Sequence, residues 1–245
     1  MNKSTTIYWA GDSTVQYNNF TTYPQTGLGQ VLGLFLRSDV MISNHAKNGR
    51  STKSFIDQSR LVPIYNDITA GDFLFIQFGH NDEKINDPDR YTRPFVEYKE
   101  NLVKMINLAR NKGAYPVLIT PLVRRLYDGK GGIDDGHGEY PAAMKEVAAE
   151  QNVPLIDLQA KSTAAVLAAG EEVSKHWHMN FEPGVFANFP EGKADNSHLQ
   201  YAGAYVYCGL IAEGLRELGG IYADLLLQDV LDRAAYDKET NDSNN

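Results

Sequence analysis

The feature that most constrains the fold is the alternation of short apolar runs with segments of helical periodicity along the chain. A parallel strand that is covered on both faces needs an unbroken apolar run, and parallel neighbours need a crossover connection, which is usually a helix. The sequence therefore predicts an α/β fold built from βαβ units. The five predicted strands are residues 5–11, 39–46, 72–80, 114–123 and 153–158.

The segments between and after these strands place apolar residues three and four positions apart, as one face of an amphipathic helix requires. Gly113 marks the end of one such segment, because glycine readily adopts the left-handed conformation of a helix C-cap. Residues 124–140 and 175–197 are long and irregular, and loops of that length in a compact domain are usually functional or disordered. The second is too aromatic to be disordered. The predicted helices are residues 29–37, 95–113, 140–152, 157–170 and 199–220.

Composition indicates the size and class of the molecule. The chain has 245 residues, 42% of them hydrophobic, which suits one large domain with a substantial core better than two domains. We expect that domain to span 1–236 and the polar stretch 237–245 to be a flexible tail. A formal charge of −8 disfavours nucleic acid and anionic membranes as partners. Composition does not indicate the oligomeric state.

Cysteine content and the start of the chain bear on metal binding and location. Cys208 is the only cysteine, which excludes an intrachain disulfide and a cysteine-rich zinc site. The first predicted strand begins too early to leave room for a secretion signal, and no apolar run approaches the ~20 residues that span a bilayer. We therefore expect a soluble, cytoplasmic protein.

Residues suited to acyl chemistry follow three of the predicted strands. Ser13 follows the first strand, Gly49 the second and Asn81 the third. In a doubly wound sheet the carboxyl ends of the strands share one edge, and a crevice forms between strands one and three, where the strand order reverses. A hydroxyl, a backbone N–H left accessible by glycine and a side-chain amide would then meet at one place.

Asp195 and His198 supply the remaining parts of a nucleophilic site. They stand three residues apart, in a predicted loop ahead of the last helix. A turn of that length brings an aspartate carboxylate to its own histidine, fixes the tautomer and leaves Nε2 free for a serine. Nucleophilic acyl chemistry needs this set of groups, namely a hydroxyl, a base, a carboxylate that orients the base and donors for the oxyanion.

Four ordered blocks of this sequence resemble those of the SGNH (GDSL-type) hydrolases: GDST at 11–14, Gly49, GHND at 79–82 and DNSH at 195–198. Together with TPLVRR at 120–125, they are similar to the rhamnogalacturonan acetylesterase branch of that family. The resemblance implies a three-layer α/β/α flavodoxin-like sandwich around a five-stranded parallel sheet. It also implies that the protein needs neither a cofactor nor a metal.

Carried over to this chain, the resemblance makes Ser13 the nucleophile, His198 the general base and Asp195 its orienting partner. The backbone N–H groups of Ser13 and Gly49 and the side chain of Asn81 would form the oxyanion hole. The implied activity is a serine esterase that removes acetyl groups from carbohydrate through an acyl-enzyme. Its expected substrates are acetylated pectic oligosaccharides of the rhamnogalacturonan type.

Further residues are hypothesised to contact the sugar, because an aromatic face suits the apolar C–H patches of a pyranose and guanidinium groups suit uronate carboxylates. Asp12 is left out of the catalytic set, since an aspartate in this position favours bracing the turn through backbone N–H groups. The candidates for sugar contact are His80, Trp177, Arg50, Arg124 and Arg125.

Other functions compete with this interpretation. An SGNH acyltransferase would pass the acyl group from Ser13 to an alcohol, and an esterase or thioesterase would take other small acyl esters. A non-catalytic sugar-binding protein would not need the Asp195 and His198 pair, and an isolated Ser13 would be read as a helix cap. His176 and His178 are spaced for zinc chelation in an extended segment, but no third ligand is evident nearby, so no metal site is predicted.

Overall fold

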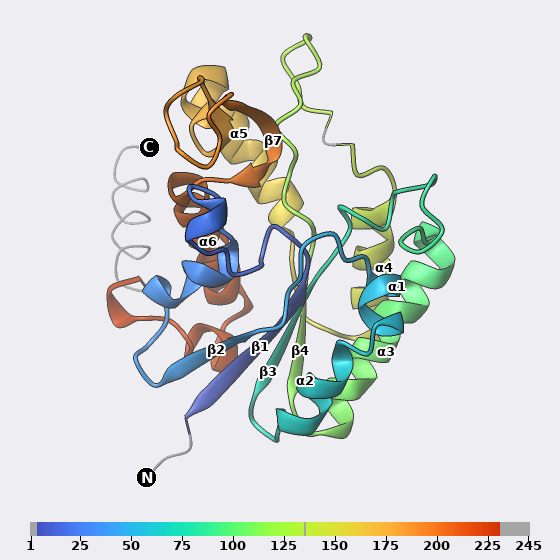
Figure 1. Ribbon diagram of the computed structural model, residues 1–245. Coiled ribbons are helices and arrows are strands. Elements are labelled where there is room, and N and C mark those ends of the chain that lie inside the picture. Colours follow the sequence, from blue (N-terminus) through green and yellow to red (C-terminus); the bar gives the residue numbers. More distant parts are fainter. Residues whose placement is uncertain (1–3, 135, 231–245) are drawn as a thin grey trace, which may run out of the picture.

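The structure is a computed structural model that describes residues 4–134 and 136–230. Five parallel strands form its central sheet in the order β2-β1-β3-β4-β5 (Figure 1). Each strand lies inside one of the predicted apolar runs, and the order is that of a flavodoxin-like sheet. The strands are β1 (Thr5–Gly11), β2 (Val40–Asn44), β3 (Phe73–Gln77), β4 (Tyr115–Ile119) and β5 (Leu155–Ile156).

The central strand β1 is paired on both sides, and its neighbours end close to its own end. Gly11 pairs with Gln77, the last residue of β3, and Trp9 pairs with Asn44, the last residue of β2. The chain reverses its direction of winding at β1, so the segments that follow β1 and β3 leave the sheet on either side of the predicted crevice.

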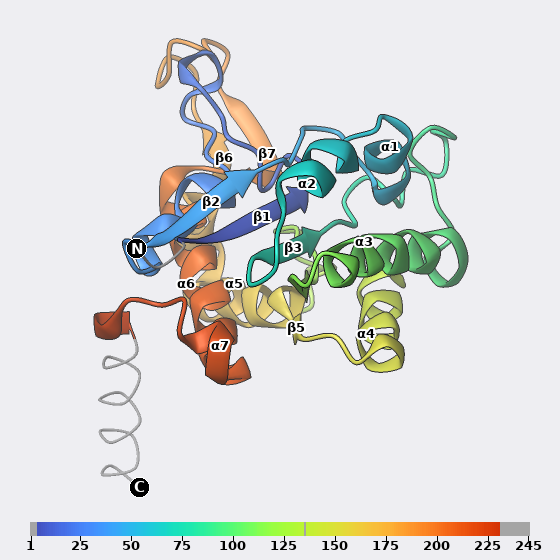
Figure 2. The same cartoon turned by 90° about the horizontal axis from the view of Figure 1, so that it is seen from below.

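Helices cover both faces of the sheet, which confirms the predicted three layers (Figure 2). One face packs against helices that precede β5, and the other packs against helices that follow it. Alternate residues of β1 face the two cores, since Tyr8 belongs to one apolar cluster and Trp9 to the other. The first layer contains α1 (Thr52–Asp57), α2 (Leu61–Asp67), α3 (Lys99–Asn111) and α4 (Tyr140–Gln151), and the second contains α5 (Leu158–Lys175), α6 (Tyr201–Leu218) and α7 (Gly220–Ala223).

The helix predicted for residues 29–37 is wrong. The segment forms two short 3-10 turns, η2 (Leu28–Gln30) and η3 (Leu32–Phe35). The N–H of Leu28 donates to the carbonyl of Thr14 at 2.8 Å, and the N–H of Gly29 to that of Val15 at 3.1 Å. The backbone N–H groups at the start of this segment are therefore bonded to the loop after β1. These bonds hold the segment close to that loop, where it forms 3-10 turns and not a regular helix.

The segments predicted to be irregular contain a second, two-stranded sheet. Antiparallel strands β6 (His178–Phe181) and β7 (Lys193–Leu199) form an arm that projects from the body, beside the loop around Phe20 (Figure 2). Asn188 Nδ2 joins the arm to this loop by donating to the Phe20 carbonyl at 2.7 Å. Asp195 and His198 thus lie on a strand, and their placement in a loop is corrected.

Two expectations about domain organisation are not tested by the described residues. The predicted tail, 237–245, lies outside the described residues, and a single domain over 1–236 stays a prediction. Within the described part, no helix combines the length and the apolar character that crossing a bilayer requires.

Candidate active site

Ser13 lies in a tight turn directly after β1. Asp12 Oδ1 accepts hydrogen bonds from the N–H and from the Oγ1 of Thr14, both at 2.9 Å, so the bracing role predicted for Asp12 is confirmed. Burial raises the pKa of Asp12, although the two bonds from Thr14 oppose this effect. The braced turn places the Ser13 hydroxyl at the carboxyl edge of the sheet.

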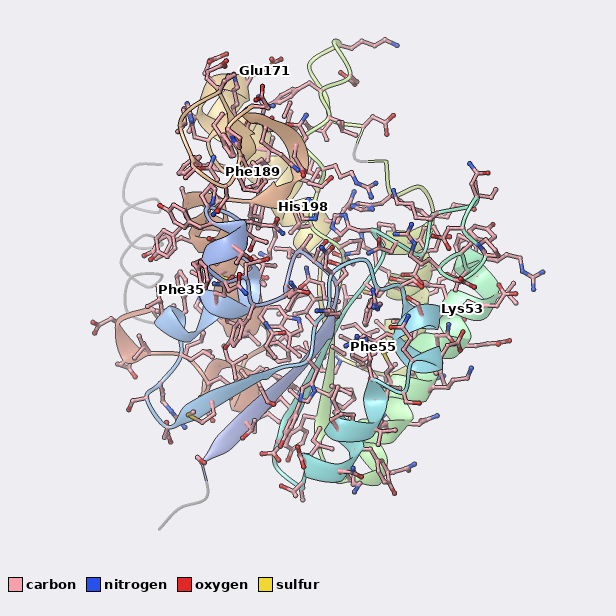
Figure 3. The ribbon with its side chains drawn as sticks, viewed as in Figure 1. Phe35, Lys53, Phe55, Glu171, Phe189 and His198 are labelled. Atoms are coloured by element: carbon pink, nitrogen blue, oxygen red, sulfur yellow. The ribbon has the colours of Figure 1, made fainter. Side chains whose placement is uncertain are left out.

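Ser13, His198 and Asp195 form a continuous hydrogen-bonded chain. His198 Nε2 lies 3.0 Å from Ser13 Oγ, and His198 Nδ1 lies 2.8 Å from Asp195 Oδ2. The other carboxylate oxygen of Asp195 accepts the backbone N–H of Ser197 at 2.9 Å and of His198 at 3.0 Å. Figure 3 places His198 over the carboxyl end of the central sheet.

The Asp195 carboxylate is held in its ionised form. Its partial burial alone would raise the pKa, but the hydrogen bonds from His198 and Ser197 outweigh this effect and keep the pKa well below its usual range. An ionised carboxylate at Nδ1 fixes the imidazole tautomer with its proton on that nitrogen, which leaves Nε2 as an acceptor toward Ser13.

A cavity of about 260 Å³ opens over the Ser13 hydroxyl. Ser13, Gly49, Asn81 and His198 all line it, so four of the five predicted catalytic and oxyanion residues meet there, while Asp195 supports His198. The remaining lining residues are Thr14, Asn48, His80, Lys84, Arg90, Arg124 and Ser197.

The three predicted oxyanion donors are all at the cavity wall. Gly49 has a φ of 74°, a conformation that favours glycine, and no described residue accepts its backbone N–H or that of Ser13. Asn81 Nδ2 donates one hydrogen to the carbonyl of Arg50 at 3.1 Å. Its second amide hydrogen is available to a ligand in the cavity.

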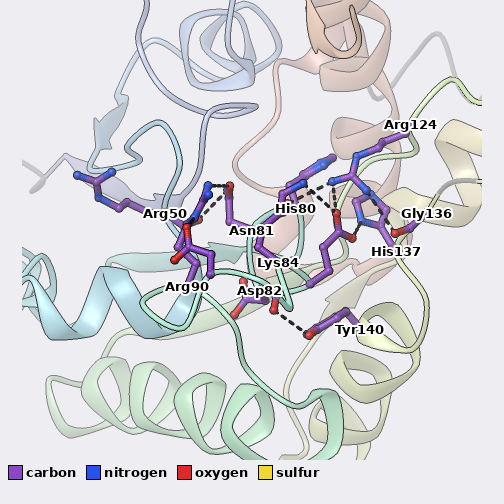
Figure 4. A network of polar contacts seen from close by, with 12 residues as sticks. Arg50, His80, Asn81, Asp82, Lys84, Arg90, Arg124, Gly136, His137 and Tyr140 are labelled. Carbon is purple, nitrogen blue, oxygen red and sulfur yellow. Dashed lines mark hydrogen bonds and ion pairs between the residues drawn. The ribbon is translucent and has the colours of Figure 1, made fainter.

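The GHND block that carries Asn81 is fixed from below. Gly79 has a φ of 153°, and a Cβ there would lie 2.8 Å from Pro121 Cγ, so the chain turns at a point where only glycine fits. The buried Asp82 carboxylate accepts the N–H of Thr52 at 3.0 Å, while the Tyr140 hydroxyl donates to the Asp82 carbonyl at 2.8 Å (Figure 4). These bonds hold the loop after β3 against α1 and α4.

His80 and Arg124, two of the predicted sugar contacts, line the cavity. The His80 ring is buried edge-on against His137 at a centroid distance of 4.4 Å, and neither ring nitrogen bonds a described residue. Burial, followed by the nearby His137 and Arg124, lowers the pKa of His80 well below its usual value. Arg124 forms an ion pair with Glu83 and donates to the His80 carbonyl at 3.2 Å (Figure 4).

The other three proposed sugar contacts do not line the cavity around Ser13. The Trp177 ring packs edge-on against Tyr207 at 5.9 Å, at the edge of the apolar core. The Arg50 guanidinium donates to Gln58 Oε1 at 2.6 Å, and that of Arg125 donates to Ser174 Oγ at 2.9 Å. These side chains have partners within the protein, and their contact with sugar stays a prediction.

Two cationic residues of the cavity were not anticipated. Lys84 lies three residues after Asn81, and Arg90 donates to Asn81 Oδ1 at 3.2 Å (Figure 4). Both belong to the charged stretch NDEKINDPDR, 81–90, which follows β3. The signal was present in the sequence, because loops at the carboxyl ends of strands supply ligand contacts in this class of sheet.

The two closely spaced histidines do not assemble a metal site. His178 is buried, with Nδ1 3.1 Å from the Ser174 carbonyl and Nε2 3.3 Å from the Tyr207 hydroxyl, while His176 is exposed at the end of α5. In the part of the chain that the structure covers, no group of three or more histidine, cysteine, aspartate or glutamate side chains is arranged to hold a metal ion.

The chain is similar to proteins of known name and of known structure. The chain is 43% identical over 219 residues to the rhamnogalacturonan acetylesterase RhgT of Bacillus subtilis (strain 168), an alignment that covers 89% of this chain and 93% of the relative. It also resembles the solved Bacillus subtilis protein YXIM, with 27% identity and a TM-score of 0.74 over 88% of this chain and 57% of that one.

A catalytic mutant of Axe2, an acetylxylan esterase from Geobacillus stearothermophilus, shares the fold at 13% identity, with a TM-score of 0.59 over 87% of this chain and 95% of that one. Residues 9–203 match the GDSL-like Lipase/Acylhydrolase family, a span that contains Ser13, Asn81 and His198. The chain belongs to the GDSL-like lipase/acylhydrolase family.

Proposed function

We propose that this protein is a serine esterase that removes acetyl groups from carbohydrate, with acetylated rhamnogalacturonan oligosaccharides as its substrates. The observation that carries the proposal is the chain from Ser13 Oγ through His198 to Asp195, at the carboxyl edge of the sheet and open to a cavity. The identity of 43% to a rhamnogalacturonan acetylesterase supports the choice of sugar.

In the acylation step, Ser13 Oγ attacks the carbonyl carbon of the acetyl ester while His198 Nε2 takes its proton. The ionised Asp195 stabilises the imidazolium that forms. The Ser13 and Gly49 N–H groups and Asn81 Nδ2 then donate to the oxyanion of the tetrahedral intermediate. When this intermediate collapses, His198 returns the proton to the sugar oxygen, the sugar leaves and an acetyl-Ser13 ester remains.

The deacylation step repeats this chemistry with water. His198 Nε2 removes a proton from a water molecule as the water attacks the acetyl carbonyl, and the same donors hold the second oxyanion. Collapse breaks the bond to Ser13 Oγ, and the proton on His198 returns to that oxygen. Acetate leaves and the free enzyme is restored, with each proton accounted for.

The cavity suits an acidic sugar although the chain carries a formal charge of −8. Lys84, Arg90 and Arg124 line it, and no carboxylate among the described residues does. Lys84 has a side chain that is 45% exposed, and its charge lies 3.8 Å from the nearest oxygen of Glu83, so it is the cation most available to a uronate. We assign sugar contact to Lys84, Arg124 and His80.

Acetate release by the wild type and by Ser13→Ala tests the proposal, with 4-nitrophenyl acetate and acetylated rhamnogalacturonan oligosaccharides as substrates. We expect activity on both substrates in the wild type and its loss in Ser13→Ala. Ser197→Ala is a matched control, because Ser197 lines the same cavity and contributes only its backbone N–H to Asp195. Activity that survives in Ser13→Ala, or a wild type inactive on both substrates, would contradict the proposal.

A further inference from the structure

The orientation of the Asn81 side chain decides whether it can stabilise an oxyanion. A carboxamide offers donors on Nδ2 and an acceptor on Oδ1, and a half-turn about its last bond exchanges the two with little change in shape. Only the Nδ2 end stabilises negative charge, because Oδ1 would repel it. The oxyanion hole therefore needs contacts that select one of the two orientations.

Two partners of opposite character select the orientation of Asn81 (Figure 4). The carbonyl of Arg50, which can only accept, lies 3.1 Å from Asn81 Nδ2. The guanidinium of Arg90, which can only donate, lies with Nη1 3.2 Å from Asn81 Oδ1. A flipped amide would place oxygen against oxygen at Arg50 and N–H against N–H at Arg90.

Arg90 is itself held in place. Its Nε donates to Asp87 Oδ2 at 2.6 Å, and its backbone N–H donates to the Asp87 carbonyl at 3.0 Å. The hydrogen bond from Arg90 lowers the pKa of Asp87. The charged carboxylate in turn holds the guanidinium in position. One edge of the guanidinium faces Asp87 while Nη1 reaches Asn81.

We propose that Arg90 is a positioning residue for the reaction, which acts by locking Asn81 with Nδ2 toward the cavity over Ser13. The inference rests on the proposed function, since it takes Asn81 to be an oxyanion donor. The cation also draws electron density toward Oδ1, which strengthens Nδ2–H as a donor because hydrogen bonds in a chain polarise one another. Arg90 thus contributes to the transition state without contacting the reacting atoms.

Kinetics on 4-nitrophenyl acetate test this inference, since that substrate is neutral and needs no cation for binding. We expect Arg90→Met to lower kcat by about 10–100-fold, somewhat less than the 10²–10³ typical for loss of an oxyanion donor, with KM changed by less than about threefold. Arg90→Lys keeps a cationic donor and should recover part of the loss. Arg93→Met is the matched control, because Arg93 is a nearby arginine that pairs with Glu97 and does not line the cavity.

A double-mutant comparison shows whether Arg90 acts through Asn81. We expect Arg90→Met to lower kcat no further, within about twofold, when it is added to Asn81→Ala, because residues that act as one unit are not additive. A full additional loss in that background would overturn the inference. So would a wild-type kcat in Arg90→Met or in Asn81→Ala.

A readout independent of activity separates this inference from the proposed function. With ¹⁵N-asparagine labelling, the side-chain NH₂ signals of Asn81 are assigned by their loss in Asn81→Ala. We expect them to shift toward free-asparagine positions, and to exchange faster with solvent, in Arg90→Met but not in Arg93→Met. Unchanged signals in Arg90→Met would overturn the positioning role even in an active esterase. Shifted signals in a protein without Ser13-dependent activity would count against the proposed function alone.

Discussion

At the residue scale, the Asp195 carboxylate orients His198 and also accepts backbone N–H groups, and a substitution can separate these two roles. Its Oδ2 faces His198 Nδ1 at 2.8 Å, while its Oδ1 accepts two backbone N–H groups. In Asp195→Asn, the Oδ1 of the new asparagine can still accept these two backbone N–H groups. Its amide nitrogen would instead donate to Nδ1 and drive the imidazole proton onto Nε2, where it blocks proton transfer from Ser13.

We therefore expect Asp195→Asn to lower kcat on 4-nitrophenyl acetate on the order of 10⁴-fold with little change in KM. The melting temperature of the variant, measured in parallel, checks that the protein remains folded. A kcat within tenfold of the wild type, in a folded variant, would show that Asp195 does not set the tautomer of His198.

The residues near the strand ends were predictable, while the long side chains around them were not. Ser13, Gly49 and Asn81 follow three parallel strands, so the sheet topology alone brings them to one edge. The direction of a long side chain is decided by partners elsewhere in the fold. Arg124 and Arg125 are adjacent in sequence, yet Arg124 lines the cavity and Arg125 reaches Ser174 on α5.

At the element scale, Arg125 connects the strand that carries Asp195 and His198 to the body of the protein. Its guanidinium donates to Ser174 Oγ at 2.9 Å and to Asn196 Oδ1 at 3.3 Å, and its backbone N–H donates to the Asn196 carbonyl at 2.9 Å. These bonds join the end of α5 to β7. The position of His198 over Ser13 therefore depends on this arginine.

We expect Arg125→Met to lower the free energy of unfolding by about 2–3 kcal/mol, because hydrogen bonds from a charged group are the stronger ones. Chemical denaturation measures this change. The kcat should fall equally for neutral and acidic esters, whereas Lys84→Met should raise KM for the acidic ester alone. A selective rise in KM for the acidic ester in Arg125→Met, with unchanged stability, would instead support Arg125 as a uronate contact.

The burial and length of an element determine whether it could be predicted from the sequence. Strands β1, β3 and β4 are buried on both faces over most of their length, so each reads as an apolar run. The edge strand β2 is buried only at Val40, and its pattern came from the apolar residues Val40, Met41 and Ile42. In the β6–β7 arm, β7 is buried only at Leu199, while β6 is buried at His178, Met179 and Asn180. Most residues of the arm are polar, so they gave no strand pattern. Helices α1 and α2 were also missed, since they have only 6 and 7 residues and carry little periodicity.

At the scale of the whole molecule, buried titratable groups give the fold opposing pH dependences. Burial raises the pKa of Asp82 to about 7, so stability contributed by its protonated form is lost as pH rises toward that value. Burial lowers the pKa of His178 to about 4 against about 6.5 in an unfolded chain. Between these two values the unfolded chain binds a proton that folded His178 does not, so stability falls as pH decreases.

His178→Gln isolates the histidine contribution. At pH 7 the variant loses the contacts to Ser174 and Tyr207, and we expect it to be less stable than the wild type. At pH 4.5 the wild type also bears the cost of keeping His178 neutral, so the difference between the two proteins should shrink by about 2–3 kcal/mol. Urea unfolding at both pH values measures it, with His176→Gln as the control because His176 is exposed. An equal difference at pH 7 and pH 4.5 would mean that His178 takes up its proton in the folded protein as readily as in the unfolded chain.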